Sequence, residues 1–458
     1  MIDIRPVGYV IGLLVAALGA AMLLPLLADL AEGRGEQSTF AVSALITGLS
    51  GGTLVLSCAE RKRPELTLQQ TFLLTTATWV VLPIFGALPF WLGAPQASYT
   101  DAFFEAMSAF TTTGSTVFVG LEAMPMGTLL WRGLMQWFGG IGIVVVAMAF
   151  LPALRVGGMQ IFRSEAFDTM GKILPRAAEI ALSISMIYVV LTFACLLGYS
   201  WTGMGFFDAL VHAMTTLATG GMANTDASFG AYKGPSEYVA AVFMILASLP
   251  FVRYVQLSRG APVPLFRDSQ VRAFMGVVGV IVIILVLWQL LVLDLPFEPA
   301  LREALFNAAS IMTGTGYSSV DYQEWGAFCI ALFFLIGLVG GCAGSTCCSV
   351  KIFRYQLLFS AIKLQIRRIQ SPRGVFALRY DGRPVGDDVI NSVMAFFVLF
   401  FLSLMVISII LALMGLPAIT AISGAATALA NIGPGLGPEI GPAGNFAGLA
   451  DEAKWGLA

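Results

Sequence analysis

Long runs of apolar residues that contain no charge recur along this chain. Most reach or exceed the roughly 20 residues that a transmembrane helix needs. The runs lie at 6–28, 37–59, 66–100, 133–154, 180–207, 273–293, 325–350 and 389–438, with a shorter one at 238–252. The pattern therefore predicts an all-α, polytopic membrane protein.

Four short segments within this pattern align with one another without a gap. They read DAFFEAMSAFTTTG at 101–114, DALVHAMTTLATGG at 208–221, EALFNAASIMTGTG at 303–316 and TAISGAATALANIG at 420–433. Ala stands second and sixth in each, a hydroxyl residue stands eighth, and Gly stands last. Repetition of this kind is typical of copies of one structural unit, and polar, Gly-terminated segments at membrane depth are tolerated only where they line a cavity. We predict four helix–pore loop–helix repeats around a pseudo-fourfold pore.

The repeats divide the chain into five parts. Two extra N-terminal transmembrane helices are expected in residues 1–62, and the pore repeats follow at 63–165, 166–262, 263–370 and 371–458. The sequence after Gly433 is short and contains Gly, Pro and acidic residues. We therefore expect no spanning helix after the fourth repeat, so that either the last quarter of the pore lacks a wall or the chain is cut short.

The last three residues of each repeat are the candidate selectivity filter. Backbone carbonyls can face an axis in a row only in conformations that Gly adopts at low cost, and such carbonyls replace the hydration shell of a monovalent cation. These tripeptides contain neither acidic nor basic residues, which argues against a divalent-cation or an anion filter. The candidate filter residues are Thr112, Thr113, Gly114, Thr219, Gly220, Gly221, Gly314, Thr315, Gly316, Asn431, Ile432 and Gly433.

Other polar positions of the repeats have simpler interpretations. The residues that begin the repeats are interpreted as helix N-caps that also favour the positive end of the helix dipole: Asp101, Asp208, Glu303 and Thr420. The hydroxyl residues are expected to bond a backbone carbonyl one turn back: Ser108, Thr215, Ser310 and Thr427. For His212 a structural or hydrogen-bonding role is favoured over a proton relay.

The segment LVGGCAGSTCCSVK at 338–351 places Gly, Ser and Thr in the middle of an apolar run. Helix propensity is poor there, so the segment is either a kinked helix, or a close helix crossing that needs small residues, or an unwound intramembrane loop beneath the pore. A basic amphipathic stretch follows, and then a short hairpin-like piece at 375–383. This region is the largest predicted cytoplasmic feature and a candidate docking site for a partner.

Composition supports the membrane interpretation and gives an orientation. The 458 residues are 58% hydrophobic and 11% charged, whereas soluble domains carry about 25% charged residues. Most Lys and Arg residues fall at Arg5 and in the loops at 61–63, 155–176, 253–272 and 351–383, which the positive-inside rule places in the cytoplasm. The N-terminus is therefore predicted to be cytoplasmic and the repeats to open outward. The first residues do not resemble a cleavable signal peptide.

The sequence contains few residues of the kinds that catalytic sites need. The six Cys residues form no CxxC pair and the chain has one His, so we expect neither a disulfide framework, nor a metal centre, nor a tightly bound cofactor. An intramembrane protease would need paired aspartates, HExxH, or Ser with His, and no such set is found. We predict that the chain is not an enzyme and expect no nucleic-acid partner.

Several of these motifs together resemble the Trk/Ktr/HKT superfamily of potassium transporters, and specifically its bacterial Trk membrane subunit. They are TTTGST after DAFFEAMSAF, NIGPGLG in the fourth repeat, the stretch at 134–165, GGCAGST at 340–346 and RDSQVRAF at 267–274. The resemblance runs from about residue 5 to the end of the sequence.

The resemblance implies a homodimer in which each protomer has its own pore, surrounded by membrane lipid and seated on a cytoplasmic, nucleotide-binding regulatory subunit (TrkA-like). It also implies that an intramembrane loop gates the pore. That loop maps onto Gly340, Gly341, Cys342, Ala343, Gly344, Ser345, Thr346 and Lys351. Here Cys347, Cys348 and Ser349 stand where the family usually shows a glycine-rich run, and the sequence stops before the last helix, where the family carries a basic residue below the filter.

We therefore expect potassium uptake across the bacterial inner membrane. In the family, preference for K⁺ goes with glycine in all four filter segments, as here. The membrane potential would drive uptake with about 2.3 kcal/mol per charge per 100 mV, and the regulatory subunit would gate it. The alternative is a K⁺/Na⁺ or K⁺/H⁺ symporter on the same scaffold, although no carboxylate is clearly stranded at mid-membrane to carry a proton.

Overall fold

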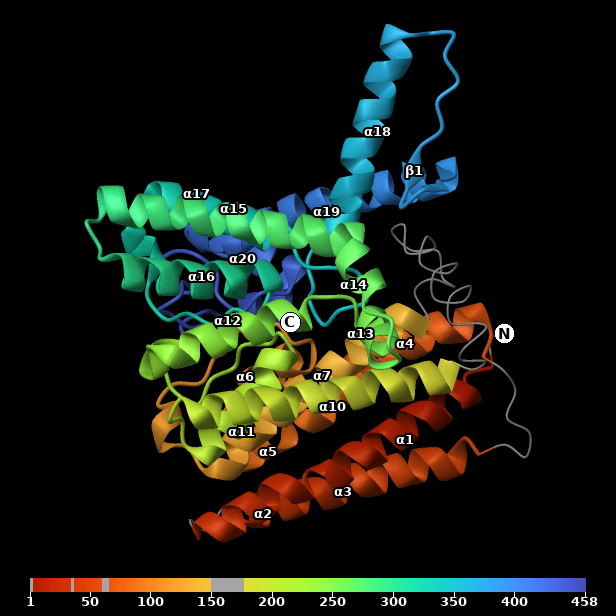
Figure 1. The fold of residues 1–458 in the computed structure, drawn as a ribbon. Coiled ribbons are helices and arrows are strands. Elements are labelled where there is room, and N and C mark those ends of the chain that lie inside the picture. The colour runs from red at the N-terminus through yellow and green to blue at the C-terminus, as the bar shows by residue number, and fades with distance from the viewer. Residues whose placement is uncertain (1–2, 34–36, 60–65, 150–176) are drawn as a thin grey trace.

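The computed structural model describes residues 3–33, 37–59, 66–149 and 177–458. The described residues form helices almost throughout, with one two-stranded hairpin (Figure 1). Six of the described helices are long and apolar enough to cross a membrane, or seven if one bent pair counts as a single span. The all-α polytopic architecture predicted from the sequence is confirmed. The predicted basic loops at 61–63 and 155–176 lie outside the described residues.

Two N-terminal spans precede the repeats, as predicted. The first consists of α1 (Arg5–Ala21) and α2 (Leu23–Glu32), and the second is α3 (Gln37–Ser57). The spans pack so closely that a Cβ on Gly51 would lie 2.4 Å from the backbone nitrogen of Ala16. Small residues permit this approach where lipid provides no hydrophobic force between helices.

The N-terminal spans are attached to the first repeat at one end. Asp29 Oδ1 accepts a hydrogen bond from Gly127 N at 2.6 Å, and Glu32 Oε2 accepts one from Met126 N at 2.8 Å. Both nitrogens lie in the first turn of the following helix, where backbone donors have no partner within the helix. Two carboxylates at the positive end of that helix therefore fix α2 against it.

Each repeat has an entering helix, a short pore helix, an extended return and, in the first three, an exit helix. The first repeat comprises α4 (Leu68–Gly86), α5 (Leu88–Leu92), α6 (Tyr99–Phe110), η1 (Leu121–Ala123) and α7 (Met126–Ala149). The second comprises α10 (Ala177–Trp201), α11 (Phe206–Leu217), η2 (Ser228–Tyr232), α12 (Pro235–Ala247) and α13 (Phe251–Ser258). The third comprises α14 (Val263–Arg267), α15 (Ser269–Val292), α16 (Phe297–Thr313), η3 (Tyr322–Trp325), α17 (Ala327–Gly337) and α18 (Ile352–Gln370). The fourth comprises α19 (Asp387–Leu413), α20 (Ala418–Ala430) and the short α21 (Asp451–Leu457).

Two interruptions in the helices lie against each other. The axes of α12 and α13 differ by 92°, and the chain between α17 and α18 contains no helix. Ala247 O accepts from the backbone and the hydroxyl of Thr346, at 3.3 and 3.0 Å, and Phe251 N donates to Gly344 O at 2.9 Å. Non-helical backbone inside a membrane needs protein partners for its polar groups. Each interruption supplies those partners to the other.

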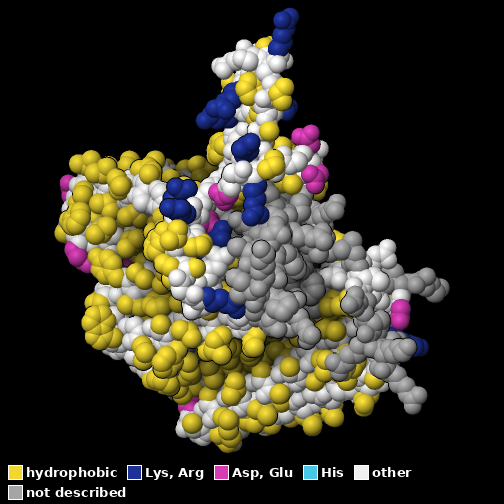
Figure 2. All heavy atoms as spheres, turned by 45° about the vertical axis from the view of Figure 1, so that its right-hand side comes forward, with side chains coloured by type: hydrophobic (Ala, Val, Ile, Leu, Met, Phe, Trp, Pro, Cys, Tyr) yellow, Lys and Arg dark blue, Asp and Glu magenta, His cyan; other side chains and the backbone are white. Residues whose placement is uncertain are grey.

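Helix α18 projects away from the bundle (Figure 1). Its outer part exposes apolar side chains, among them Phe359, Ile366 and Ile369. The chain returns through an antiparallel pair of strands, β1 (Arg379–Tyr380) and β2 (Arg383–Pro384), which overlap the predicted hairpin. Figure 2 shows apolar side chains over the flanks of the bundle and Lys and Arg side chains gathered on and around α18.

Candidate ion pore

The ends of the four aligned segments meet one another in cyclic order. A Cβ built on any of four glycines would come within about 3 Å of the backbone of a neighbouring repeat, which essentially no real Cβ does. The closest approaches are 2.0 Å from Gly114 to Gly220 O, 1.9 Å from Gly221 to Thr315 O, 2.8 Å from Gly316 to Gly433 N, and 3.0 Å from Gly433 to Gly114 O. The four segments thus close a ring in which repeats one to four follow in chain order. Any side chain at these positions would open it.

Left-handed backbone conformations recur at the first and third positions of the filter tripeptides. The φ angles are 60° at Thr112, 88° at Gly114, 51° at Thr219, 69° at Gly221, 79° at Gly314, 82° at Gly316 and 59° at Asn431. Alternation of left-handed and right-handed residues turns successive carbonyls toward the same side of a segment. Thr112, Thr219 and Asn431 hold this conformation without being glycine, at a cost of about 1 kcal/mol or more each, so the surrounding contacts must impose it.

The end of each pore helix holds the filter segment that follows it. Thr113 N and Gly220 N each donate at 2.9 Å to the carbonyl of the hydroxyl residue five positions back, Ser108 and Thr215. In the fourth repeat Ile432 N donates to Thr427 O at 3.1 Å. The turn from helix to filter is therefore built in the same way in these repeats.

The hydroxyl residues divide into two pairs, and the prediction for them was half wrong. Thr215 and Thr427 bond backward, to Val211 O at 3.1 Å and to Gly424 O at 2.7 Å. The hydroxyls of Ser108 and Ser310 instead donate forward, to Ser115 O at 2.6 Å and to Tyr317 O at 2.7 Å. Those carbonyls belong to the returning segments. Leaving such a buried carbonyl without a donor costs more free energy than the helix would gain if the Ser hydroxyl donated a second hydrogen bond to a helical carbonyl.

The residues that begin the four repeats are not N-caps, contrary to the prediction. The capping positions are taken by residues in an extended conformation, namely Ser98, Gly205, Pro296 and Pro417. Asp101, Asp208 and Thr420 are the third residues of their helices, and Glu303 is the seventh residue of the longer α16. Asp101 and Asp208 still lie in the first turn, where the dipole favours negative charge.

Gln136 on α7 is a filter-supporting residue that the sequence did not reveal. Its amide nitrogen donates to Gly220 O at 2.7 Å, and its amide oxygen accepts from Met222 N at 3.1 Å. Gln136 is fully buried. One side chain thus binds the middle of the second filter segment and the residue that follows the segment, and it ties the Gly220 carbonyl to the wall. The predicted row of carbonyls therefore has at least one member held by a side chain.

A cavity of about 270 Å³ lies outside the ring and is lined by residues from the ends of all four repeats, including Gly114, Gly221, Gly316 and Gly433. Arg132 also lines it, although 1% of the residue is exposed to solvent. Its Nε donates to the buried Glu105 carboxylate at 2.7 Å and its Nη1 to Ala223 O at 2.8 Å. The Glu105 carboxylate thereby compensates the positive charge of Arg132 beside this cavity.

The predicted gating loop lies at the end of the ring opposite this cavity. Gly340 and Gly344 have φ angles of 77° and 75°, and Lys351 N donates to Val339 O at 2.9 Å, which closes the loop on itself. A Cβ on Gly314 would lie 3.9 Å from the backbone nitrogen of Cys348. Of the three alternatives for 338–351, the structure has the unwound segment and neither the kinked helix nor the close helix crossing.

His212 is packed in an aromatic cluster. Its Nδ1 lies 2.8 Å from Asp208 O, and its ring centroid lies 4.9 Å from that of Tyr232 and 5.8 Å from that of Phe229. The residue is fully buried. These contacts agree with the structural role favoured from the sequence.

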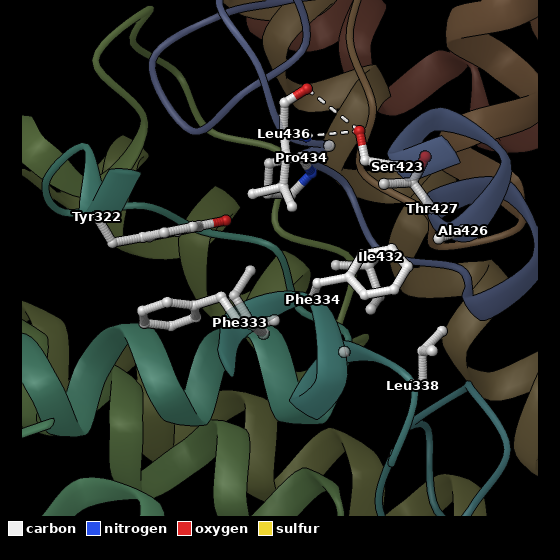
Figure 3. Close-up of a pocket in the computed structure, with 13 residues that line it drawn as sticks. Tyr322, Phe333, Phe334, Leu338, Ser423, Ala426, Thr427, Ile432, Pro434 and Leu436 are labelled. Carbon is white, nitrogen blue, oxygen red and sulfur yellow. Dashed lines mark hydrogen bonds between the residues drawn. The ribbon is translucent and has the colours of Figure 1, made fainter. Parts of the chain in front are cut away.

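A small apolar cavity lies behind the fourth filter segment, between α17 and α20 (Figure 3). Phe333, Phe334 and Ile432 line it, and the Tyr322 hydroxyl points toward it. Ser423 closes its upper edge through bonds with both backbone groups of Leu436, at 2.9 and 3.2 Å. The filter segment is therefore less tightly supported here than behind Gly220.

Four pore helices, a closed ring of glycine backbones and a membrane-spanning wall define a polytopic α-helical membrane protein with a fourfold pore domain. The TrkH family model, described as a cation transport protein, matches residues 36–451. The chain belongs to this family. Because the family is one of transport proteins, the chain is not an enzyme, as predicted.

Relatives and a solved structure agree over nearly the full length. The chain is 44% identical to the Trk system potassium uptake protein TrkI of Halomonas elongata over 98% of this chain and 92% of that protein. It is 35% identical to TrkH of Salmonella typhimurium over 98% and 94% of the two chains. The crystal structure of the potassium transporter TrkH from Vibrio parahaemolyticus matches with a TM-score of 0.90 and 31% identity, covering 100% of this chain and 95% of that one.

Proposed function

We propose that this chain mediates potassium uptake through the ring formed by its four repeats. The observation that carries the proposal is the cyclic approach of Gly114, Gly221, Gly316 and Gly433, where backbone oxygens can replace the water of a monovalent cation. Ions enter from the 270 Å³ cavity, pass the filter, and meet the loop at 340–351. The names of the relatives support K⁺ as the ion.

The orientation and the partners are part of the same proposal. Lys and Arg gather around α18, which favours this side as cytoplasmic in a bacterial inner membrane. The exposed apolar and basic surface of α18 is suited to a second copy of the chain or to a nucleotide-binding regulatory subunit, and the Trk system named for the relatives supports a multi-component assembly.

Passage without proton coupling is favoured over symport. The buried Glu105 carboxylate accepts hydrogen bonds from Arg132, Thr116 and Val117. Both oxygens of this carboxylate are thus bound by donors in the wall of the pore, which argues against a role as a mobile proton carrier.

Growth and selectivity test the proposal. The chain should restore growth at low potassium to a bacterial strain that lacks its own uptake systems.

Gly316→Ser should lower the K⁺ over Na⁺ uptake ratio at least ten-fold, because φ at this position is 82° and a Cβ would meet Gly433 N at 2.8 Å. Gly276→Ser on α15, where a Cβ meets nothing, is the control. Unchanged selectivity in Gly316→Ser would contradict the filter assignment.

A further inference from the structure

Most hydrogen bonds between the loop at 338–351 and other parts of the chain attach the loop to the wall of the pore and not to the filter. Cys342 N donates to Ser248 O at 3.0 Å, and Ala343 N donates to Gln270 Oε1 at 2.9 Å. Thr346 is bound to Ala247 O. These contacts fix residues 342–346 to α12 and α15. They leave the following residues to determine how the loop meets the filter.

Cys348 meets the filter directly. Asn431 Nδ2 donates to Cys348 Sγ at 3.1 Å, while the thiol lies 3.7 Å from Thr346 O, to which it donates. The same Asn431 amide donates to Thr111 O at 2.8 Å and accepts from the Thr113 hydroxyl. One side chain therefore joins the first and fourth filter segments to the loop.

The neighbouring thiol behaves differently. Cys347 Sγ accepts a hydrogen bond from Gly341 N at 2.8 Å, within the loop itself, and Cys347 is fully buried. Cys348 and Asn431 are partly exposed, although most of the residues around them are buried. Both groups are thus half-buried, in contrast to Cys347.

We propose that Cys348 and Asn431 form a latch that holds the loop against the inner end of the filter and that must release before ions pass. The inference rests on the proposed transport function. An N–H···S bond is a contact that can break and re-form, because a neutral hydrogen bond contributes only about 0.5–1.5 kcal/mol. Its loss frees Cys348 from Asn431, while the wall contacts of residues 342–346 remain in place.

The chain offers matched variants for a flux experiment with the full-length protein in liposomes. Cys348→Ala removes the acceptor and should raise K⁺ flux roughly five-fold, the shift expected in a two-state equilibrium from losing one hydrogen bond. Cys348→Ser keeps an acceptor and should stay within about two-fold of the parent. Cys58→Ala, at the other partly exposed cysteine, should leave flux unchanged.

A second measurement does not depend on transport. Asn431→Gly suits the φ of 59° and reproduces the residue that the third repeat carries at the same position, Gly314, so the ring is expected to persist. N-ethylmaleimide should modify Cys348 several-fold faster in Asn431→Gly than in the parent. Modification of Cys58, measured by mass spectrometry in the same samples, should proceed at one rate in both.

The two measurements separate the latch from the transport function. Equal flux in the parent, Cys348→Ala and Cys348→Ser, or equal labelling of Cys348 in the parent and Asn431→Gly, overturns the latch. Absence of K⁺ flux in every variant counts against the transport function alone, because the labelling comparison still tests the latch. Faster labelling of Cys58 as well as Cys348 would show general loosening and also overturns it.

Discussion

At the scale of single residues, the pore depends on buried charged side chains that are stable only because an opposite charge lies beside each of them. Arg132 and Glu105 are both buried beside the outer cavity. Breaking a buried pair is costlier than replacing both members, because the remaining charge has no partner. The pair therefore keeps a positive charge acceptable beside the cavity through which we propose that cations enter.

Glu105→Gln should lower K⁺ uptake roughly ten-fold, the factor that about 1.4 kcal/mol of added repulsion produces. The guanidinium of Arg132 then loses the carboxylate that pairs with it. Glu105→Gln combined with Arg132→Met should recover part of the uptake and of the thermal stability. Uptake assays and thermal unfolding of the three proteins would decide. A double variant worse than the sum of the single variants would contradict this account.

Some residues of the site could be predicted from the sequence, and others could not. The positions that meet in the ring could be predicted because all four repeats carry the same local pattern and meet through their backbones. Gln136 and Arg132 act through long side chains on partners that lie 84 and 27 positions away in the chain. No local pattern marks such contacts. The forward bonds of Ser108 and Ser310 were missed because they depend on where the chain returns.

At the scale of elements, the interruptions of helices depend on one another. The Gly-rich composition of 338–351 indicated an interruption, but the apolar run at 238–252 did not reveal the 92° bend between α12 and α13. The pattern of apolar residues predicts which segments are buried and how long they are. It cannot show that another segment of the chain supplies the hydrogen bonds that a helix loses where it is interrupted. The bend and the loop are stable together because each satisfies the backbone of the other.

Gln270→Leu should loosen the loop without unfolding the bundle. Gln270 is buried and its Oε1 accepts from Ala343 N at 2.9 Å, so the variant leaves a buried donor unpaired, at a cost of about 1–3 kcal/mol. Hydrogen exchange at 340–347 should accelerate by at least five-fold. Gln69→Leu at the exposed start of α4 serves as the control. Unchanged exchange at the loop in Gln270→Leu would show that Gln270 does not anchor it.

At the scale of the whole molecule, the ring must be closed between its last and first members. Lys454 on α21 pairs with Asp101 on α6 at 2.6 Å, and Trp455 stacks on Phe103 with ring centroids 4.9 Å apart. These contacts join the end of the fourth repeat to the first pore helix. The four repeats therefore support one another as a cycle, and an ion bound at the axis would contact all four of them.

Potassium should stabilise the folded protein if the ring binds it. A ligand that binds only the native state at 100 times its Kd adds about 2.7 kcal/mol, which corresponds to roughly 2–3 °C in the unfolding midpoint of a chain this long. We expect a higher midpoint in KCl than in NaCl or choline chloride at equal ionic strength. Gly316→Ser should remove the difference between KCl and NaCl, whereas Gly276→Ser should retain it. Equal midpoints in all three salts for the parent protein would argue that the axis does not hold the ion.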